Sequence, residues 1–178
     1  MNYLEFKDKM FSLACFSTDQ VYAWKPDFDR NNITRWTKNG LLIRLRQGYF
    51  TFREYKDKAD YAWYFANRIY RPSYISLHSA LSFHGLIPES VVQITSVTSL
   101  KTASFKNPFG EYSYKTLKKE LMFGYSLITI EDGRSMQIAD PVRPSARMAV
   151  PNQSSITGKY GRSTIIENWV LSVNLILM

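Results

Sequence analysis

The chain has 178 residues, of which 45% are hydrophobic, and its formal net charge is +8. This length suits one mid-sized domain or two small ones, and the composition supplies enough apolar side chains for a buried core, which excludes wholesale disorder. A basic chain suits a polyanion such as a nucleic acid, although a modest positive charge is also common in proteins that bind nothing anionic.

The cysteine usage and the start of the chain indicate a cytoplasmic protein. Cys15 is the only cysteine, so the chain can form neither an internal disulfide nor a Cys-rich zinc site, which fits a reducing compartment. Residues 1–9 are charged and lack the apolar core of a signal peptide. No run of about 18 apolar residues occurs, so we expect no membrane span.

The first part of the chain predicts two helices. Apolar spacing indicates a helix over residues 3–14, with a buried face formed by Leu4, Met10, Phe11 and Ala14. Ser17 and Gln20 have the spacing of a capping box, so we expect a second helix to begin there. Pro26 would end that helix. Its core-facing residues would be Val21, Tyr22 and Trp24.

A third helix and a basic hairpin are predicted next. Asp27 or Asp29 can cap the helix, and Gly40 would end it in a left-handed conformation. Its buried stripe would consist of Ile33, Trp36 and Thr37. Residues 41–46 alternate, so one face of a strand would carry Leu41, Ile43 and Leu45, and the other Leu42, Arg44 and Arg46. Gln47 and Gly48 would form the turn, before a return strand over 49–53.

The third helix and the hairpin carry residue types that contact DNA. Asparagine can pair with adenine and arginine with guanine, whereas lysine, threonine and backbone amides suit phosphates. The residues that we predict to contact DNA are Thr18, Arg30, Asn31, Asn32, Thr34, Arg35, Lys38, Asn39, Arg44, Arg46 and Gln47. A basic face on an isolated helix is more often merely solvated. Here, the order of two helices, a glycine-terminated helix and a basic hairpin favours a winged helix-turn-helix and DNA binding.

Some winged helices bind protein or RNA instead of DNA. The alternative is therefore a protein-interaction module that docks a partner through the same scaffold. DNA-binding assays separate the two hypotheses.

The rest of the chain predicts a second, smaller domain. Residues 54–58 form a charged connector, which we take as the boundary between a winged-helix domain over 1–55 and a second domain over 56–141. Helices are predicted over 59–71 and 76–85, and strands over 91–100, 112–117, 125–131 and 135–139, with Asp132 and Gly133 in a turn. The expected fold class is α+β, with a winged helix followed by a small mixed α/β domain that is incomplete at its C-terminus.

No arrangement of residues indicates catalysis. His78 and His84 are six residues apart on one predicted helix, so they would lie on opposite faces and not form a metal pair. The serines lack a nucleophile-elbow context, and no glycine-rich phosphate loop occurs. We therefore expect no enzymatic activity, no cofactor and no metal.

An ordered set of motifs resembles the AbiEi-type antitoxins of type IV toxin–antitoxin systems over about residues 1–141. The first motif is NITRWTKNGLLIRLRQGYF at 32–50, in the predicted third helix and hairpin. The second domain contributes PSYISLHSALSFHGLIP at 72–88, TSVTSLKT at 95–102 and FGY at 123–125. Each motif is weak alone, and the ordered set is more specific.

The resemblance implies a function that composition alone does not. Such a protein would bind the double-stranded operator DNA of its own operon and repress transcription. Its second domain would support the antitoxin role. Its functional partner would be a nucleotidyltransferase-like toxin, and direct contact with that toxin would not be required.

Residues 142–178 depart from the family pattern and form an atypical tail. The family continues after the position of Pro141 with a helix, whereas Pro144 and Pro151 occur here where that helix would run. We hypothesise a shifted reading frame or a truncation near Pro141. Translation of the alternative frames beyond that codon tests this, and the hypothesis fails if none restores an apolar helical pattern.

Overall fold

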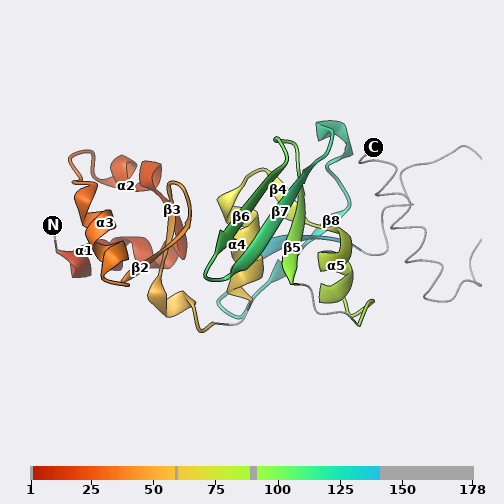
Figure 1. The fold of residues 1–178 in the computed structure, drawn as a ribbon, viewed down its shortest axis with the longest axis horizontal. Helices are drawn as coiled ribbons and strands as arrows, with labels where there is room; N and C mark the ends of the chain where they lie inside the picture. The colour runs from red at the N-terminus through yellow and green to blue at the C-terminus, as the bar shows by residue number, and fades with distance from the viewer. Residues whose placement is uncertain (1, 59, 89–91, 141–178) are drawn as a thin grey trace, which may run out of the picture.

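The structure of the protein is a computed structural model that describes residues 2–58, 60–88 and 92–140 (Figure 1). These residues form helices and two separate sheets, which is a mixed α+β arrangement. The strands of one sheet come from residues 15–52 and those of the other from residues 73–139. The predicted domain limits stay a prediction, and the predicted tail over 142–178 lies outside the described residues.

Three helices surround a small sheet in the N-terminal part. The helices are α1 (Tyr3–Met10), α2 (Thr18–Trp24) and α3 (Asn31–Lys38). The antiparallel sheet has the order β1-β3-β2, and its strands are β1 (Cys15–Ser17), β2 (Leu42–Arg46) and β3 (Tyr49–Phe52). Two short 3-10 helices, Phe11–Leu13 and Arg53–Tyr55, follow α1 and β3.

Local end signals predicted several of these boundaries correctly. The capping box at α2 is present, because the Ser17 backbone N–H donates to Gln20 Oε1 at 2.8 Å and the Gln20 N–H donates to Ser17 Oγ at 3.2 Å. The predicted cap of α3 is shifted, because Arg30 occupies the N-cap position without a side-chain cap bond, and Asp29 Oδ1, one residue earlier, accepts the Asn31 backbone N–H. Gly40 follows α3 with a φ of +71°, the left-handed conformation that glycine tolerates best.

The buried face of the first helix was predicted correctly only in part, since Met10 and Ala14 are buried but Leu4 is not. Helix α1 ends at Met10, and Ala14 adopts a φ of 58° before the chain enters β1. Leu4 is 63% exposed, whereas Phe6 is 0% exposed and packs against the rings of Phe16 and Trp36. The buried face of α1 is therefore formed by Phe6 and Met10, which are four residues apart, and Leu4 lies on the exposed side. The α2 prediction was also wrong in part, since Tyr22 is 36% exposed, whereas Val21 is fully buried.

The predicted alternation along the first hairpin strand was also wrong. The pairing of β2 with β3 shifts by one residue between Arg44 and Arg46. Such a bulge places successive side chains out of phase, so Leu42 and Leu45 are both buried. Arg44 is exposed and Arg46 is half-buried, and the two arginines do not share one face as expected.

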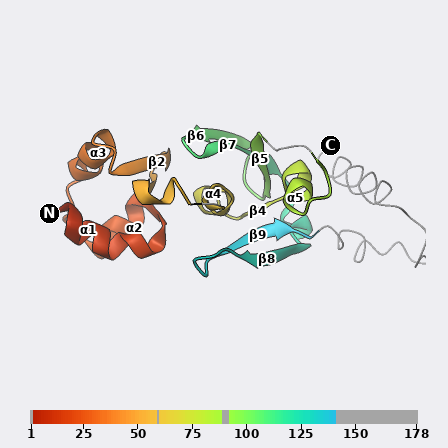
Figure 2. The ribbon, with the colours of Figure 1, turned by 90° about the horizontal axis from the view of Figure 1, so that it is seen from below.

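A six-stranded mixed sheet forms the C-terminal part. Its order is β6-β7-β5-β4-β9-β8, and its strands are β4 (Ser73–Ile75), β5 (Gln93–Thr98), β6 (Ala103–Asn107), β7 (Gly110–Thr116), β8 (Tyr125–Thr129) and β9 (Ser135–Ala139). Its helices are α4 (Tyr61–Ile69), α5 (Leu77–Phe83) and the 3-10 helix Lys119–Leu121. Figure 2 shows α4 end-on between the β5–β7 arm and the β8–β9 arm of the sheet.

Strand β9 has the bounds that were predicted, residues 135–139. Gly133 occupies the turn before it with a φ of +74°. Strands β1, β4 and β6 were not predicted. Within the described residues, none of the helices combines the length and apolar character required to cross a membrane.

We predict that Phe6→Ala lowers the free energy of unfolding by about 3–5 kcal/mol, because it removes a fully buried ring and leaves a cavity. Leu4→Ala on the same helix should change it by less than about 0.5 kcal/mol, since Leu4 is exposed. Urea denaturation of the full chain measures both. Similar losses for the two variants would contradict the observed orientation of α1.

Candidate nucleic-acid interface

Helix α3 is fixed on the N-terminal part by its apolar side. Ile33 and Trp36 are buried, and the Trp36 ring lies 4.7 Å from that of Phe6 and 5.4 Å from that of Tyr3, centroid to centroid. Thr37 is half-buried and donates its hydroxyl to the Ile33 carbonyl oxygen. The opposite side of α3 is therefore held in a defined orientation toward solvent.

A groove of about 210 Å³ separates α3 from the β2–β3 hairpin. Five residues predicted to contact DNA line it together: Thr18, Arg30, Thr34, Lys38 and Arg44. They come from the start of α2, from α3 with the residue before it, and from β2. The structure thus gathers residues that are up to 26 positions apart in the sequence (44 − 18).

The charge of this groove is positive and uncompensated within the described part of the chain. Arg30, Lys38 and Arg44 are exposed, and none forms an ion pair with a described residue. No carboxylate is among the residues that line the groove. Such a surface attracts phosphates, whose binding releases condensed counterions.

The remaining predicted residues on α3 lie outside the groove. The Arg35 Nη2 donates to Asn32 Oδ1 at 2.8 Å, and both Arg35 and Asn31 are exposed. Arg35 is thus oriented along the helix surface in the free protein, and a base edge would compete with Asn32 for it. Asn39 is exposed at the end of α3 and Gln47 in the hairpin turn.

The hairpin turn is attached to the start of α2. The Thr18 backbone N–H donates to the Gly48 carbonyl oxygen at 2.9 Å. Gly48 has a φ of +79°, and a Cβ at this position would lie 3.6 Å from Thr18 Oγ1. Gly48 and Phe50 also line the groove, although only the turn at Gly48 was predicted. The residues at 47 and 48 predict a turn from local sequence alone. They do not predict the contact of that turn with α2, because this contact joins residues that are distant in the chain.

Arg46 does not belong to this groove. Its Nη1 donates to the Ile69 carbonyl oxygen at 2.7 Å, at the end of α4. Its guanidinium carbon lies 5.0 Å from the ring centroid of Tyr49, 5.2 Å from that of Tyr70 and 5.1 Å from that of Phe105. The bulge before it and these partners direct the side chain to the C-terminal part. Contrary to the prediction, Arg46 therefore faces the C-terminal part and not the groove.

Neither histidine belongs to a metal cluster of the described residues. His84 Nε2 lies 3.1 Å from the Ala139 carbonyl oxygen, so it is partnered by backbone. In the described ranges, no three His, Cys, Asp or Glu side chains are close enough together to hold a metal ion.

The chain matches no protein-family model, and no curated protein is significantly similar to it.

We predict that Arg46→Ala lowers the free energy of unfolding by about 1–3 kcal/mol, because it removes a charged hydrogen bond and the stacking of a guanidinium on three rings. Arg44→Ala, two residues away and exposed, should change it by less than about 0.5 kcal/mol. Chemical denaturation of both variants measures the difference. Equal effects on the free energy of unfolding would contradict the separate positions of the two arginines.

Proposed function

We propose that the chain is a winged-helix protein that binds double-stranded DNA, with α3 as the recognition helix and the β2–β3 hairpin as the wing. The observation that carries the proposal is the groove in which Thr18, Arg30, Thr34, Lys38 and Arg44 meet without a carboxylate. An α-helix is about 10–12 Å wide with its side chains, and the major groove of B-DNA is about 12 Å wide. The exposed side of α3 fits such a groove.

The residues of this surface divide into two roles. Asn31 and Arg35 are exposed on α3 and carry the types of donor group that pair with base edges. Lys38, Arg44 and Thr18 lie along the groove and suit phosphate oxygens. The first group would set sequence preference, whereas the second would set affinity and its salt dependence.

The biological role that we propose is that of a cytoplasmic antitoxin and autorepressor of a type IV toxin–antitoxin operon. The support is the resemblance of the motifs, since the motif at 32–50 spans α3 and the hairpin and the motif at 72–88 spans β4 and α5. The functional partner would be a nucleotidyltransferase-like toxin, without a requirement for direct contact. A neighbouring gene that encodes a protein of another class would contradict this part of the proposal.

One observation favours the alternative, a protein-docking module. Strand β8 is an edge of the six-stranded sheet, and it exposes Tyr125 at 41% and Leu127 at 66%. An exposed sheet edge with apolar side chains can accept a strand of another protein. Binding to DNA from upstream of the gene, compared with a scrambled duplex of equal length, distinguishes the two roles.

We predict that Arg35→Ala weakens binding to the upstream duplex by about 1–3 kcal/mol and reduces the preference over the scrambled duplex, because a base contact is lost. Fluorescence anisotropy with both duplexes at one salt concentration measures this. Lys118→Ala, which removes an exposed charge from the C-terminal part, serves as the control. An Arg35→Ala variant with unchanged affinity and preference would rule out Arg35 as a base-reading residue.

We predict that Lys38→Ala weakens binding to both duplexes equally and lowers the slope of log K against log salt by about 1, because one phosphate contact is lost. A salt titration of the parent, Lys38→Ala and Lys118→Ala proteins measures the slopes. If Lys38→Ala and Lys118→Ala have the same slope as the parent, the groove is not the phosphate-binding surface.

A further inference from the structure

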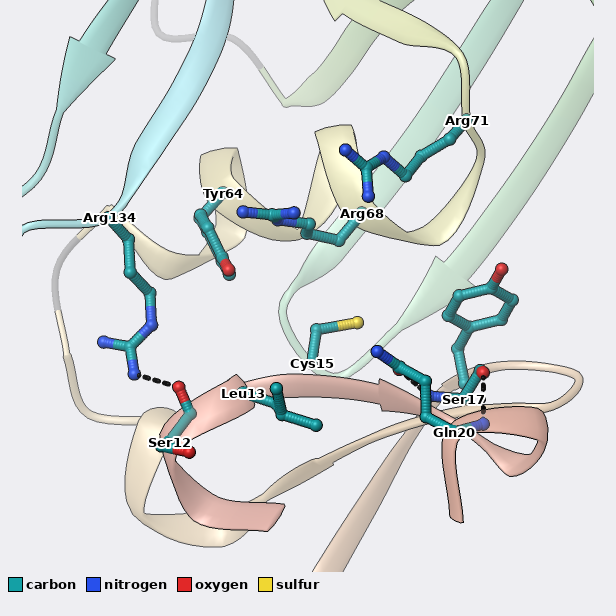
Figure 3. Close-up of a pocket in the computed structure, with 10 residues that line it drawn as sticks. Ser12, Leu13, Cys15, Ser17, Gln20, Tyr64, Arg68, Arg71 and Arg134 are labelled. Atoms are coloured by element: carbon teal, nitrogen blue, oxygen red, sulfur yellow. Dashed lines mark hydrogen bonds between the residues drawn. The ribbon is translucent and has the colours of Figure 1, made fainter. Parts of the chain in front are cut away.

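A second cavity, of about 400 Å³, lies between the N-terminal and C-terminal parts. Figure 3 shows residues of β1 and α2 below it, with Arg68 and Tyr64 of α4 and Arg71 above it. Arg134, from the turn between β8 and β9, closes one side, where its Nη2 donates to the Ser12 carbonyl oxygen at 2.8 Å. Its volume is within the range of about 300–1,000 Å³ of small-molecule sites.

The cavity carries three guanidinium groups, and no carboxylate is among its described lining residues. Arg134 is compensated, since its Nη1 lies 3.2 Å from Asp132 Oδ2. Arg68 and Arg71 form no ion pair with any residue that the structure describes. Two positive charges therefore remain at this cavity for a ligand.

Arg68 is held by a ring contact, and Arg71 lines the same cavity from an exposed position. The Arg68 guanidinium carbon lies 4.8 Å from the ring centroid of the buried Tyr64, which holds it at the cavity wall. Cys15 projects into the cavity from the opposite wall (Figure 3). Burial raises the pKa of its thiol to about 12, and the charges of Arg68 and Arg71 oppose that rise. The guanidinium groups of Arg68 and Arg71 are thus both close enough to the Cys15 thiol to influence its pKa.

The wall opposite the arginines supplies further polar groups. Ser17 and Gln20 line the cavity, and Gln20 Oε1 already accepts the Ser17 N–H at 2.8 Å. The amide group of Gln20 therefore has its NH₂ donors left for a ligand. Two guanidinium groups and an amide donor form a set of donors without a charged acceptor, which matches a phosphate group.

We propose that this cavity between the two parts binds a small phosphate-bearing molecule, whose phosphate is held by Arg68 and Arg71. The site is separate from the groove beside α3, because the two share no lining residue. A ligand there would contact both parts of the chain and stabilise the folded protein, since the unfolded chain does not assemble the site.

The test is calorimetric titration of the full chain with pyrophosphate and with ADP, without DNA and at constant ionic strength set with chloride. We expect saturable binding of one equivalent of probe with a Kd below about 1 mM, and an increase in melting temperature with the same probes. Arg71→Gln should weaken binding at least about tenfold, because it removes one of the two charges that hold the phosphate. Arg71 is exposed, so its loss leaves the fold intact. Lys118→Gln, with the same charge change, should bind as the parent does.

Three results would overturn the proposal. One is no saturable binding of either probe, and another is equal affinity of the parent and Arg71→Gln proteins. The third is displacement of pyrophosphate by duplex DNA together with weaker DNA binding by Arg71→Gln, which would assign the site to DNA phosphates. The first two results come from the titration without DNA, and the third comes from a separate competition titration in which duplex DNA is added to the pyrophosphate complex. Failure of the cavity proposal in the first titration is therefore observed separately from failure of the DNA-binding proposal.

Discussion

Arg46 occupies the position where the two parts of the chain meet, and its contacts set the direction of the hairpin. Its guanidinium donates to the last residue of α4 and stacks on Tyr70 and Phe105 of the C-terminal part. A second hydrogen bond from a side chain to the backbone joins the two parts, in which Asn107 Nδ2 of the C-terminal part donates to the Leu45 carbonyl oxygen at 3.0 Å. The hairpin that borders the groove is thus held from behind by the larger sheet, and its position depends on non-local contacts.

Two further contacts complete the frame around the hairpin. The Thr18–Gly48 bond fastens its turn to α2, and the Phe6–Trp36 ring contact fastens α3 to α1. The groove between α3 and β2 is therefore bordered by elements that are each fixed elsewhere. The backbone elements that carry its polar side chains are positioned before any partner arrives, which limits the backbone entropy that binding would cost.

The sequence predicted the features that depend on neighbouring residues. The capping box at Ser17, the left-handed Gly40 and the turn at Gly133 follow from local chemistry, and each is present. Strands β1 and β4 have three residues each, too few for alternation to indicate them, and they form because distant strands pair with them. The place of Arg46 was mispredicted because strict alternation ignores the bulge after Arg44. The sequence itself did not show that Thr18 and Arg44 line one groove. That proximity was expected only because the order of helices and hairpin is typical of a winged helix.

The one-residue bulge in β2 gives Arg44 and Arg46 separate environments, although only Leu45 lies between them. One arginine is open to solvent beside the groove, and the other is inserted between the two parts. Mutation can therefore change the properties of the outer surface without disturbing the attachment of the hairpin. In evolution, the exposed surface beside α3 can therefore diverge while the architecture that supports it is kept.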